Sequence, residues 1–158
     1  MKWLKIIGVL LFVGLTARAQ EVKKISASDL GKILKRNDGV YVVNLWATWC
    51  KPCVEEIPFI NKIAKEYKDN NVKVIMVSLD YDNAFPNKIE SFARKKGITS
   101  PIYWLDETNP SAIANVIDKN WKGLIPCTIL VNNKKGYRKF VAQSMDEKTW
   151  EREVKMAL

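Results

Sequence analysis

Two cysteines separated by two residues are the part of this sequence best suited to chemistry. Cys50 and Cys53 flank a Lys-Pro dipeptide, and a third cysteine is Cys127. The chain of 158 residues contains no histidine, which excludes a Ser-His-Asp triad, a Cys-His dyad and a zinc site with histidine ligands. The available chemistry is therefore that of thiols, carboxylates and lysines.

A redox-active pair competes with three different roles for these cysteines. A zinc site needs more ligands than the single remaining cysteine, Cys127, supplies. Structural disulfides usually close long loops, whereas a two-residue spacer closes almost none. A peroxidatic cysteine of the peroxiredoxin type has a threonine three residues before it, whereas Thr48 lies two before Cys50. We therefore expect thiol-disulfide chemistry, with no metal and no cofactor.

The pair lies where a strand gives way to a helix. Residues 40–46 form an almost continuous apolar run, as in a strand buried on both faces, and a helical pattern follows over 50–67. Free N–H groups and the dipole at a helix N-terminus can lower a cysteine pKa from about 8.5 toward 7. Cys50 is thus the expected nucleophile, and Cys53, one turn further on, the resolving thiol.

The residues beside the cysteines are expected to contact the substrate. Pro52 suits the first helical turn, because its missing N–H would have no helical partner there. Lys51 adds a positive charge that favours a thiolate. Trp49 is expected to shield the cysteines and contribute to the surface on which a substrate rests.

Strand and helix patterns alternate through the rest of the chain. We expect a short edge strand at 22–26 and a terminal hairpin whose strands, 127–131 and 137–141, are joined by an Asn- and Gly-containing loop. This order predicts an α/β fold with a mixed sheet between helices. Further strands are expected at 72–79 and 102–105, and further helices around Leu30, Ile89, Ile113 and Trp150.

The first 19 residues have the pattern of a cleavable secretory signal. Lys2 and Lys5 precede an apolar run over 6–15, and small residues at 17 and 19 suit a signal peptidase. The run is much shorter than the roughly 20 residues that a membrane-spanning helix needs. We therefore expect a signal peptide at 1–19, one domain at 20–158, and no stable membrane insertion after cleavage.

The excess of basic residues partly belongs to this leader. Its removal takes away three of the 26 lysines and arginines and lowers the formal charge from +9 to +6. The remaining basic residues form short scattered groups, such as 94–96 and 134–135, which is typical of solvated surfaces. We expect no nucleic-acid partner.

Several motifs together resemble the thioredoxin superfamily, and most closely its exported TlpA/ResA-type branch. They are the segment NLWATWCKPC at 44–53, Pro58 five residues after the second cysteine, and Ile125-Pro126 ahead of a strand. The resemblance implies a thioredoxin-like three-layer sandwich with an inserted helix and strand, which 85–105 would supply. It also implies a cis Ile125–Pro126 bond opposite the disulfide, with the Ile125 backbone available to pair with an extended substrate.

The sequence departs from cytosolic thioredoxins at Asn44, where those proteins carry a buried aspartate. The branch it resembles has a glutamate three residues after the second cysteine, and Glu56 occupies that position. On a helix, Glu56 lies about 60° from Cys53 and Glu55 about 200° away. We expect a desolvated Glu56 with a raised pKa to exchange a proton with Cys53; the alternative is a surface carboxylate at the positive end of the helix.

Cys127 directly follows the expected cis-proline, where relatives more often have threonine. Two interpretations remain open. It is a third redox thiol within reach of the pair, or a small buried side chain at the start of a strand.

The resemblance implies a thiol-disulfide oxidoreductase in the periplasm or another exported location. We expect it to act as a reductant of protein disulfides, such as cytochrome c maturation clients, and to be recharged by a membrane thiol-electron donor. The alternatives are an oxidase or isomerase of the same fold and a non-catalytic binding module on a thioredoxin-like scaffold.

Overall fold

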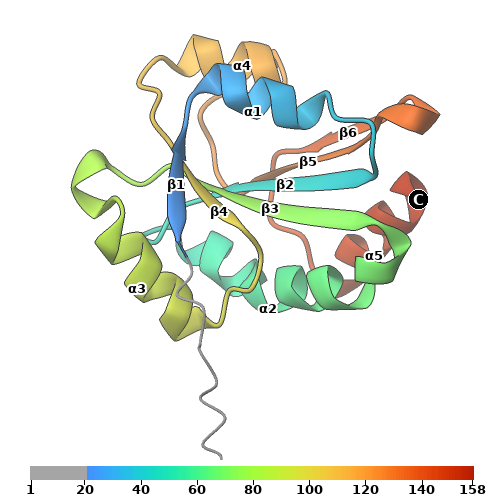
Figure 1. Ribbon diagram of the computed structural model, residues 1–158, viewed down its shortest axis with the longest axis horizontal. Helices are drawn as coiled ribbons and strands as arrows, with labels where there is room; N and C mark the ends of the chain where they lie inside the picture. The colour runs from blue at the N-terminus through green and yellow to red at the C-terminus, as the bar shows by residue number, and fades with distance from the viewer. Residues whose placement is uncertain (1–20) are drawn as a thin grey trace, which may run out of the picture.

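A mixed six-stranded sheet forms the middle of three layers in the computed structural model, which describes residues 21–158 (Figure 1). Helices α1 and α4 cover one face of the sheet, and α2, α3 and α5 cover the other (Figure 1). This arrangement confirms the predicted α/β sandwich. The signal peptide predicted at 1–19 lies outside the described residues.

The observed elements follow the predicted order closely. The strands are β1 (Val22–Ile25), β2 (Val40–Trp46), β3 (Val72–Ser78), β4 (Ile102–Leu105), β5 (Cys127–Asn132) and β6 (Tyr137–Val141). The helices are α1 (Ala27–Leu34), α2 (Lys51–Glu66), α3 (Asn87–Lys96), α4 (Pro110–Ile117) and α5 (Glu147–Ala157). The strand predicted at 22–26 ends one residue early because Ser26 caps α1: its hydroxyl accepts a hydrogen bond from the Asp29 N–H.

Strand β2 is the centre of the sheet. It pairs in parallel with β3 along its whole length and antiparallel with β5, and all seven of its residues are buried. A strand that is covered on both faces has no need of polar alternation, which explains the apolar run in the sequence. Because β2 is hydrogen-bonded to a strand on each side, the position of the segment that follows it, which leads to Cys50, is fixed.

The segment over 85–105 supplies an extra helix and strand, as expected. Strand β4 pairs in parallel with both β1 and β3, so it lies between them in the order β1-β4-β3-β2-β5-β6. Strand β1 is consequently at the edge of the sheet, as predicted for that part of the chain.

Two apolar clusters fill the two sides of the sheet. The cluster under α2, α3 and α5 contains Ile57, Ile60 and Trp150, and also both cysteines of the pair. The cluster under α1 and α4 contains Leu30 and Ile113. The cysteine pair therefore belongs to the α2 side of the core.

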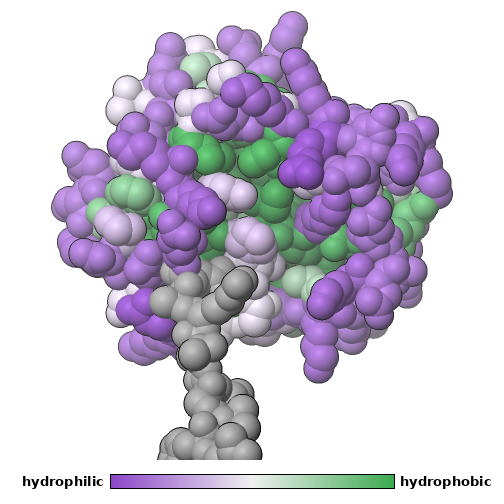
Figure 2. Space-filling model, in the orientation of Figure 1, coloured by the Kyte–Doolittle hydropathy of each residue, from purple (hydrophilic) through white to green (hydrophobic). Residues whose placement is uncertain are grey.

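The face drawn in Figure 2 has apolar surface at its middle, bordered by hydrophilic side chains. A groove of about 740 Å³ opens beside the first half of β3, where Val72, Val74 and Tyr103 line it. Of the residues of β3, only the second half, Met76–Ser78, pairs with β4, so within the described residues the first half has no strand on that side. None of the predicted site residues lines this groove. Within residues 21–158, no helix is both long and apolar enough to cross a bilayer.

Candidate redox site

The cysteine pair is a disulfide at the start of α2. Cys50 is the N-cap of this helix, and the Cys53 N–H donates to the Cys50 Sγ at 3.3 Å. Pro52 lies in the first helical turn, where a missing N–H costs no helical bond. Cys53 is completely buried, whereas Cys50 is 5% exposed. The sulfur nearer the surface is thus the one at the helix N-terminus, where a thiolate is stabilised.

Glu56 lies one turn beyond Cys53 on the buried face of α2. It is 2% exposed, whereas the neighbouring Glu55 is exposed and lies 3.9 Å from the Lys51 ammonium. The Glu56 Oε1 accepts hydrogen bonds from the Met145 N–H at 2.6 Å and from the Trp150 Nε1 at 3.2 Å. Glu56 is thus a buried carboxyl, as expected, and not a surface carboxylate. Its exchange of a proton with Cys53 stays a prediction.

Burial controls the acidity of Glu56. Desolvation raises its pKa from 4.5 to about 7, against the two donors, which favour the charged form. The second oxygen, Oε2, is buried and has no hydrogen-bond partner among the described residues. A carboxyl that titrates near neutral pH, with one oxygen free, is suited to accept and release a proton.

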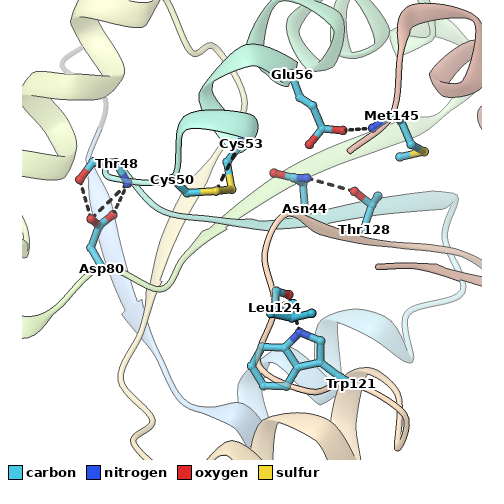
Figure 3. The surroundings of a disulfide bond; sticks show 10 residues. All are labelled: Asn44, Thr48, Cys50, Cys53, Glu56, Asp80, Trp121, Leu124, Thr128 and Met145. Carbon is cyan, nitrogen blue, oxygen red and sulfur yellow. Dashed lines mark hydrogen bonds between the residues drawn. A yellow bond between two sulfur atoms is a disulfide. The ribbon is translucent and has the colours of Figure 1, made fainter. Parts of the chain in front are cut away.

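Asn44 lies on β2 below Glu56 and Cys53. It is fully buried, and its Nδ2 donates to the Thr128 Oγ1 of β5 at 3.0 Å. Figure 3 shows the carboxyl of Glu56 and the side chain of Asn44 turned into the same space beside the disulfide.

A buried aspartate holds the loop that leads to the disulfide. The Asp80 carboxylate accepts hydrogen bonds from the Thr48 N–H at 3.0 Å and the Thr48 Oγ1 at 2.5 Å (Figure 3). It also accepts one from the Ser78 Oγ at 2.8 Å. The backbone carbonyl of Asp80 accepts a further hydrogen bond from the Trp104 Nε1 at 2.7 Å. The chain after β3 is thereby tied to the chain after β2, two residues before Cys50.

The loop before β5 carries the second predicted motif. The Ile125–Pro126 bond is cis, as expected. The register pairs Cys127 with Leu45, which places this loop beside the end of β2 that leads to the cysteines. The Trp121 Nε1 donates to the Leu124 carbonyl at 2.8 Å and fixes the loop from behind (Figure 3). Ile125 is half-buried and Pro126 is buried.

The predicted contact residues on the cysteine side are exposed. Trp49 is 57% exposed and stacks on Tyr81, which is 71% exposed, with ring centroids 6.2 Å apart. Lys51 and Pro52 are exposed as well. Within the described residues, large exposed apolar side chains are few, and Trp49, Tyr81 and Leu124 belong to the segments that surround the disulfide.

Cys127 is on the other side of the sheet from the pair. It is a free thiol, completely buried in the cluster under α1 and α4, whereas Cys50 and Cys53 belong to the cluster under α2. Burial raises the pKa of the Cys127 thiol to about 12. This position is that of the small buried side chain, one of the two interpretations of Cys127.

The structure thus brings most of the predicted site together. Cys50, Cys53 and Glu56 share the start of α2, and the cis-proline loop lies beside the preceding strand. The residues that support them were not predicted. Asp80 directly follows the apolar strand β3, and a lone acid at that point was the available signal. Nothing local marks Met145, since its backbone N–H is what contacts Glu56.

A three-layer α/β sandwich with a Cys-x-x-Cys disulfide at a helix N-terminus and a cis-proline loop beside it defines a thioredoxin-fold protein. The chain belongs to the Redoxin family, which matches residues 20–150. It is 29% identical over 117 residues to the thiol-disulfide oxidoreductase ResA of Geobacillus kaustophilus, a match that covers 74% of this chain and 62% of that protein. This chain therefore spans less than two thirds of that relative.

Solved structures show the same fold. A thioredoxin-related protein from Neisseria meningitidis serogroup B is 30% identical with a TM-score of 0.65, covering 78% of this chain and 87% of its own. A thiol:disulfide interchange protein from Chlorobium tepidum TLS is 21% identical with a TM-score of 0.62, covering 83% of each chain. These similarities confirm the thioredoxin-like fold predicted from the sequence.

The Asp80 contacts predict a large loss of stability when its carboxylate is removed. The variant D80A leaves three donors without their acceptor, and we expect it to lower the free energy of unfolding by about 2–4 kcal/mol. Urea denaturation of the oxidised protein measures this. The control D82A removes an exposed carboxylate two residues on and should change the value by less than about 0.5 kcal/mol. Equal effects of the two variants would contradict the role of Asp80.

The raised pKa of Glu56 predicts a pH dependence of stability. Between its ordinary pKa of 4.5 and about 7, the folded protein holds a proton that the unfolded chain has lost. The stabilisation is complete below pH 4.5 and disappears as the pH rises through 7, a loss of roughly 3 kcal/mol over the whole window. The other carboxyls with shifted pKa values have them lowered, so they do not titrate in this window.

In the variant E56Q, the free energy of unfolding should therefore not fall as the pH rises through 7. Urea denaturation of the oxidised wild type and E56Q at pH 5 and pH 8 compares the two slopes. The same slope in both proteins would show that Glu56 titrates at its ordinary pKa.

Proposed function

We propose that this chain is a thiol-disulfide oxidoreductase that reduces protein disulfides outside the cytoplasm. The observation that carries the proposal is the Cys50–Cys53 disulfide at the N-terminus of α2 with Glu56 buried one turn beyond it. A purely structural bridge needs no buried carboxyl with a pKa near neutral. A thiol that must lose its proton at neutral pH does need such a group.

The first step uses the cysteine nearer the surface. The Cys50 thiolate attacks one sulfur of the client disulfide and forms a mixed disulfide, and the other client sulfur leaves as a thiolate that takes a proton from water. The exposed Trp49 directly precedes Cys50, and the Ile125–Pro126 loop lies beside the end of the strand that leads to the cysteines. We assign these residues, with Lys51 and Pro52, to contact with an extended client segment.

The second step uses the buried cysteine. Cys53 passes its thiol proton to the Glu56 carboxylate, and its thiolate attacks the Cys50 Sγ. The bond between Cys50 and the client breaks as the Cys50–Cys53 disulfide forms. The client leaves as a thiolate, which takes up the proton that Glu56 releases. The protein has then lost two electrons, and the client disulfide has become a dithiol.

The proposed setting follows from the start of the chain and from the resemblance. The pattern over 1–19 supports export to the periplasm or an equivalent compartment. A protein oxidised by its clients there needs a reductant, and we propose a membrane thiol-electron donor for this role. Cytochrome c maturation clients are the client class that the ResA resemblance favours.

Trapping tests the roles of the two cysteines. The variant C53S cannot resolve the mixed disulfide, so after incubation with a disulfide-containing peptide we expect a covalent adduct on Cys50 in non-reducing mass spectrometry. The variant C50S should form none. C127S is the matched control, and combined with C53S it should trap as much peptide as C53S alone. Trapping through Cys127, or none in C53S, would contradict the proposal.

The equilibrium with glutathione tests the direction of electron flow. We expect a reduction potential close to that of thioredoxin, about −270 mV, because a reductant must give up its electrons readily. Thiol quenching and mass spectrometry of the protein in glutathione buffers of varied ratio measure this value. A potential near the about −120 mV of a strong disulfide oxidant would favour the oxidase alternative instead.

A further inference from the structure

A second buried polar atom faces the redox pair without a partner. The Asn44 Oδ1 is buried and has no hydrogen-bond donor in the part of the chain that the structure describes. The other end of the same amide is fixed, because Nδ2 donates to the Thr128 Oγ1 at 3.0 Å. Figure 3 shows the consequence: the amide nitrogen points toward Thr128, and the oxygen points the opposite way, toward the side of Cys53 and Glu56.

The strands on both sides of Asn44 offer it no titratable group. Its register partners are Met76 on β3 and Thr128 on β5. Cys127, the residue before Thr128, packs on the other side of the sheet. Figure 3 shows the cysteine pair and Glu56, all at the start of α2, on the side of the sheet that Asn44 faces. A disulfide has no hydrogen to donate, whereas a thiol has one.

We propose that Asn44 is a positioning residue whose carbonyl accepts the thiol hydrogen of Cys53 when the pair is reduced. The inference rests on the proposed function, since it assigns Asn44 a part in the same redox cycle. Reduction adds two electrons and two protons to the Cys50–Cys53 disulfide. The proton on Cys53 gives the buried oxygen the donor that it lacks in the oxidised state.

Two effects of this bond act in the same direction. In the oxidised protein the orphaned carbonyl is costly, because it is buried and unpaired. In the reduced protein the same carbonyl is satisfied and stabilises the thiol form of Cys53 over the thiolate. Both effects favour the dithiol, and the second raises the pKa of Cys53.

This role complements that of Glu56. An amide does not titrate, so Asn44 holds the Cys53 hydrogen in place and cannot remove it. The carboxyl oxygen of Glu56 without a partner among the described residues, Oε2, is the group that takes the proton. Asn44 would thus keep the resolving thiol protonated until the mixed disulfide forms, and Glu56 would then accept the proton and free the thiolate for attack.

The variant N44L removes the acceptor, because it replaces the amide with an apolar side chain of similar size. We expect its equilibrium constant for reduction by glutathione to be about fivefold smaller than that of the wild type, the effect of losing one hydrogen bond. The pH dependence of the same equilibrium should place the Cys53 pKa lower than in the wild type. Quenching with an alkylating reagent and mass spectrometry measure both quantities.

Two further variants separate this role from general loss of stability. N132L replaces another buried asparagine of the sheet, whose Nδ2 donates to the Ala157 carbonyl at 2.8 Å, and should leave the glutathione equilibrium unchanged within about twofold. T128V releases the amide of Asn44 from its partner and should shift the equilibrium in the same direction as N44L. It replaces N44L in the comparison if N44L does not fold, which thermal melting reports.

The outcomes are distinguishable from those of the proposed function. An unchanged or larger equilibrium constant in the Asn44 variant, or an equal shift in N132L, would overturn the role of Asn44. The glutathione equilibrium needs no client. A wild-type protein that fails to reduce insulin would therefore refute the proposed reductase activity, whereas an unaltered equilibrium in an Asn44 variant of an active protein would refute this inference alone.

Discussion

The burial of the Glu56 carboxyl is the constraint on which the arrangement of the site depends. A carboxylate taken out of water is costly unless it is paired or protonated, and here two donors contact one oxygen while the other has no partner among residues 21–158. The donors come from the segment before α5 and from α5 itself. Placing a proton-accepting group beside Cys53 thus requires the C-terminal helix to close over α2, and Lys62 of α2 reinforces this contact through Glu147 and Glu151.

The surroundings of the disulfide divide into a rigid interior and an exposed rim. Asp80 and Trp121 each fix a loop by bonds to its backbone or side chains, so the cysteines and the cis-proline loop keep their relative positions. Trp49, Tyr81 and Leu124 stand exposed on those fixed loops. Rigid loops that carry exposed apolar side chains are suited to recognising an extended client, because little conformational freedom is lost on binding.

Much of this organisation follows from local sequence. The apolar run of β2, the cysteine spacing and the i to i+3 relation of Cys53 and Glu56 are local patterns, and each predicts its own structure. The cis bond before Pro126 came instead from the resemblance, as did the expectation that the helix and strand over 85–105 are an insertion. The partners of Glu56 could not be predicted, because they depend on how α5 packs on α2, 89 and 94 residues further along the chain. The unpaired oxygen of Asn44 is likewise a property of packing, since Thr128 of another strand fixes the direction in which the amide points.

Proton exchange between Glu56 and Cys53 is central to the proposed redox cycle, and carbon-13 NMR of the glutamate carboxyl groups tests it most directly. The titration of Glu56, assigned by comparison with E56Q, is followed in the oxidised and the reduced protein. We expect a midpoint near pH 7 in the oxidised state, in line with the raised pKa. On reduction the titration should change, because carboxyl and thiol then share their protons. A midpoint near the ordinary value of about 4.5 in both states would contradict this exchange.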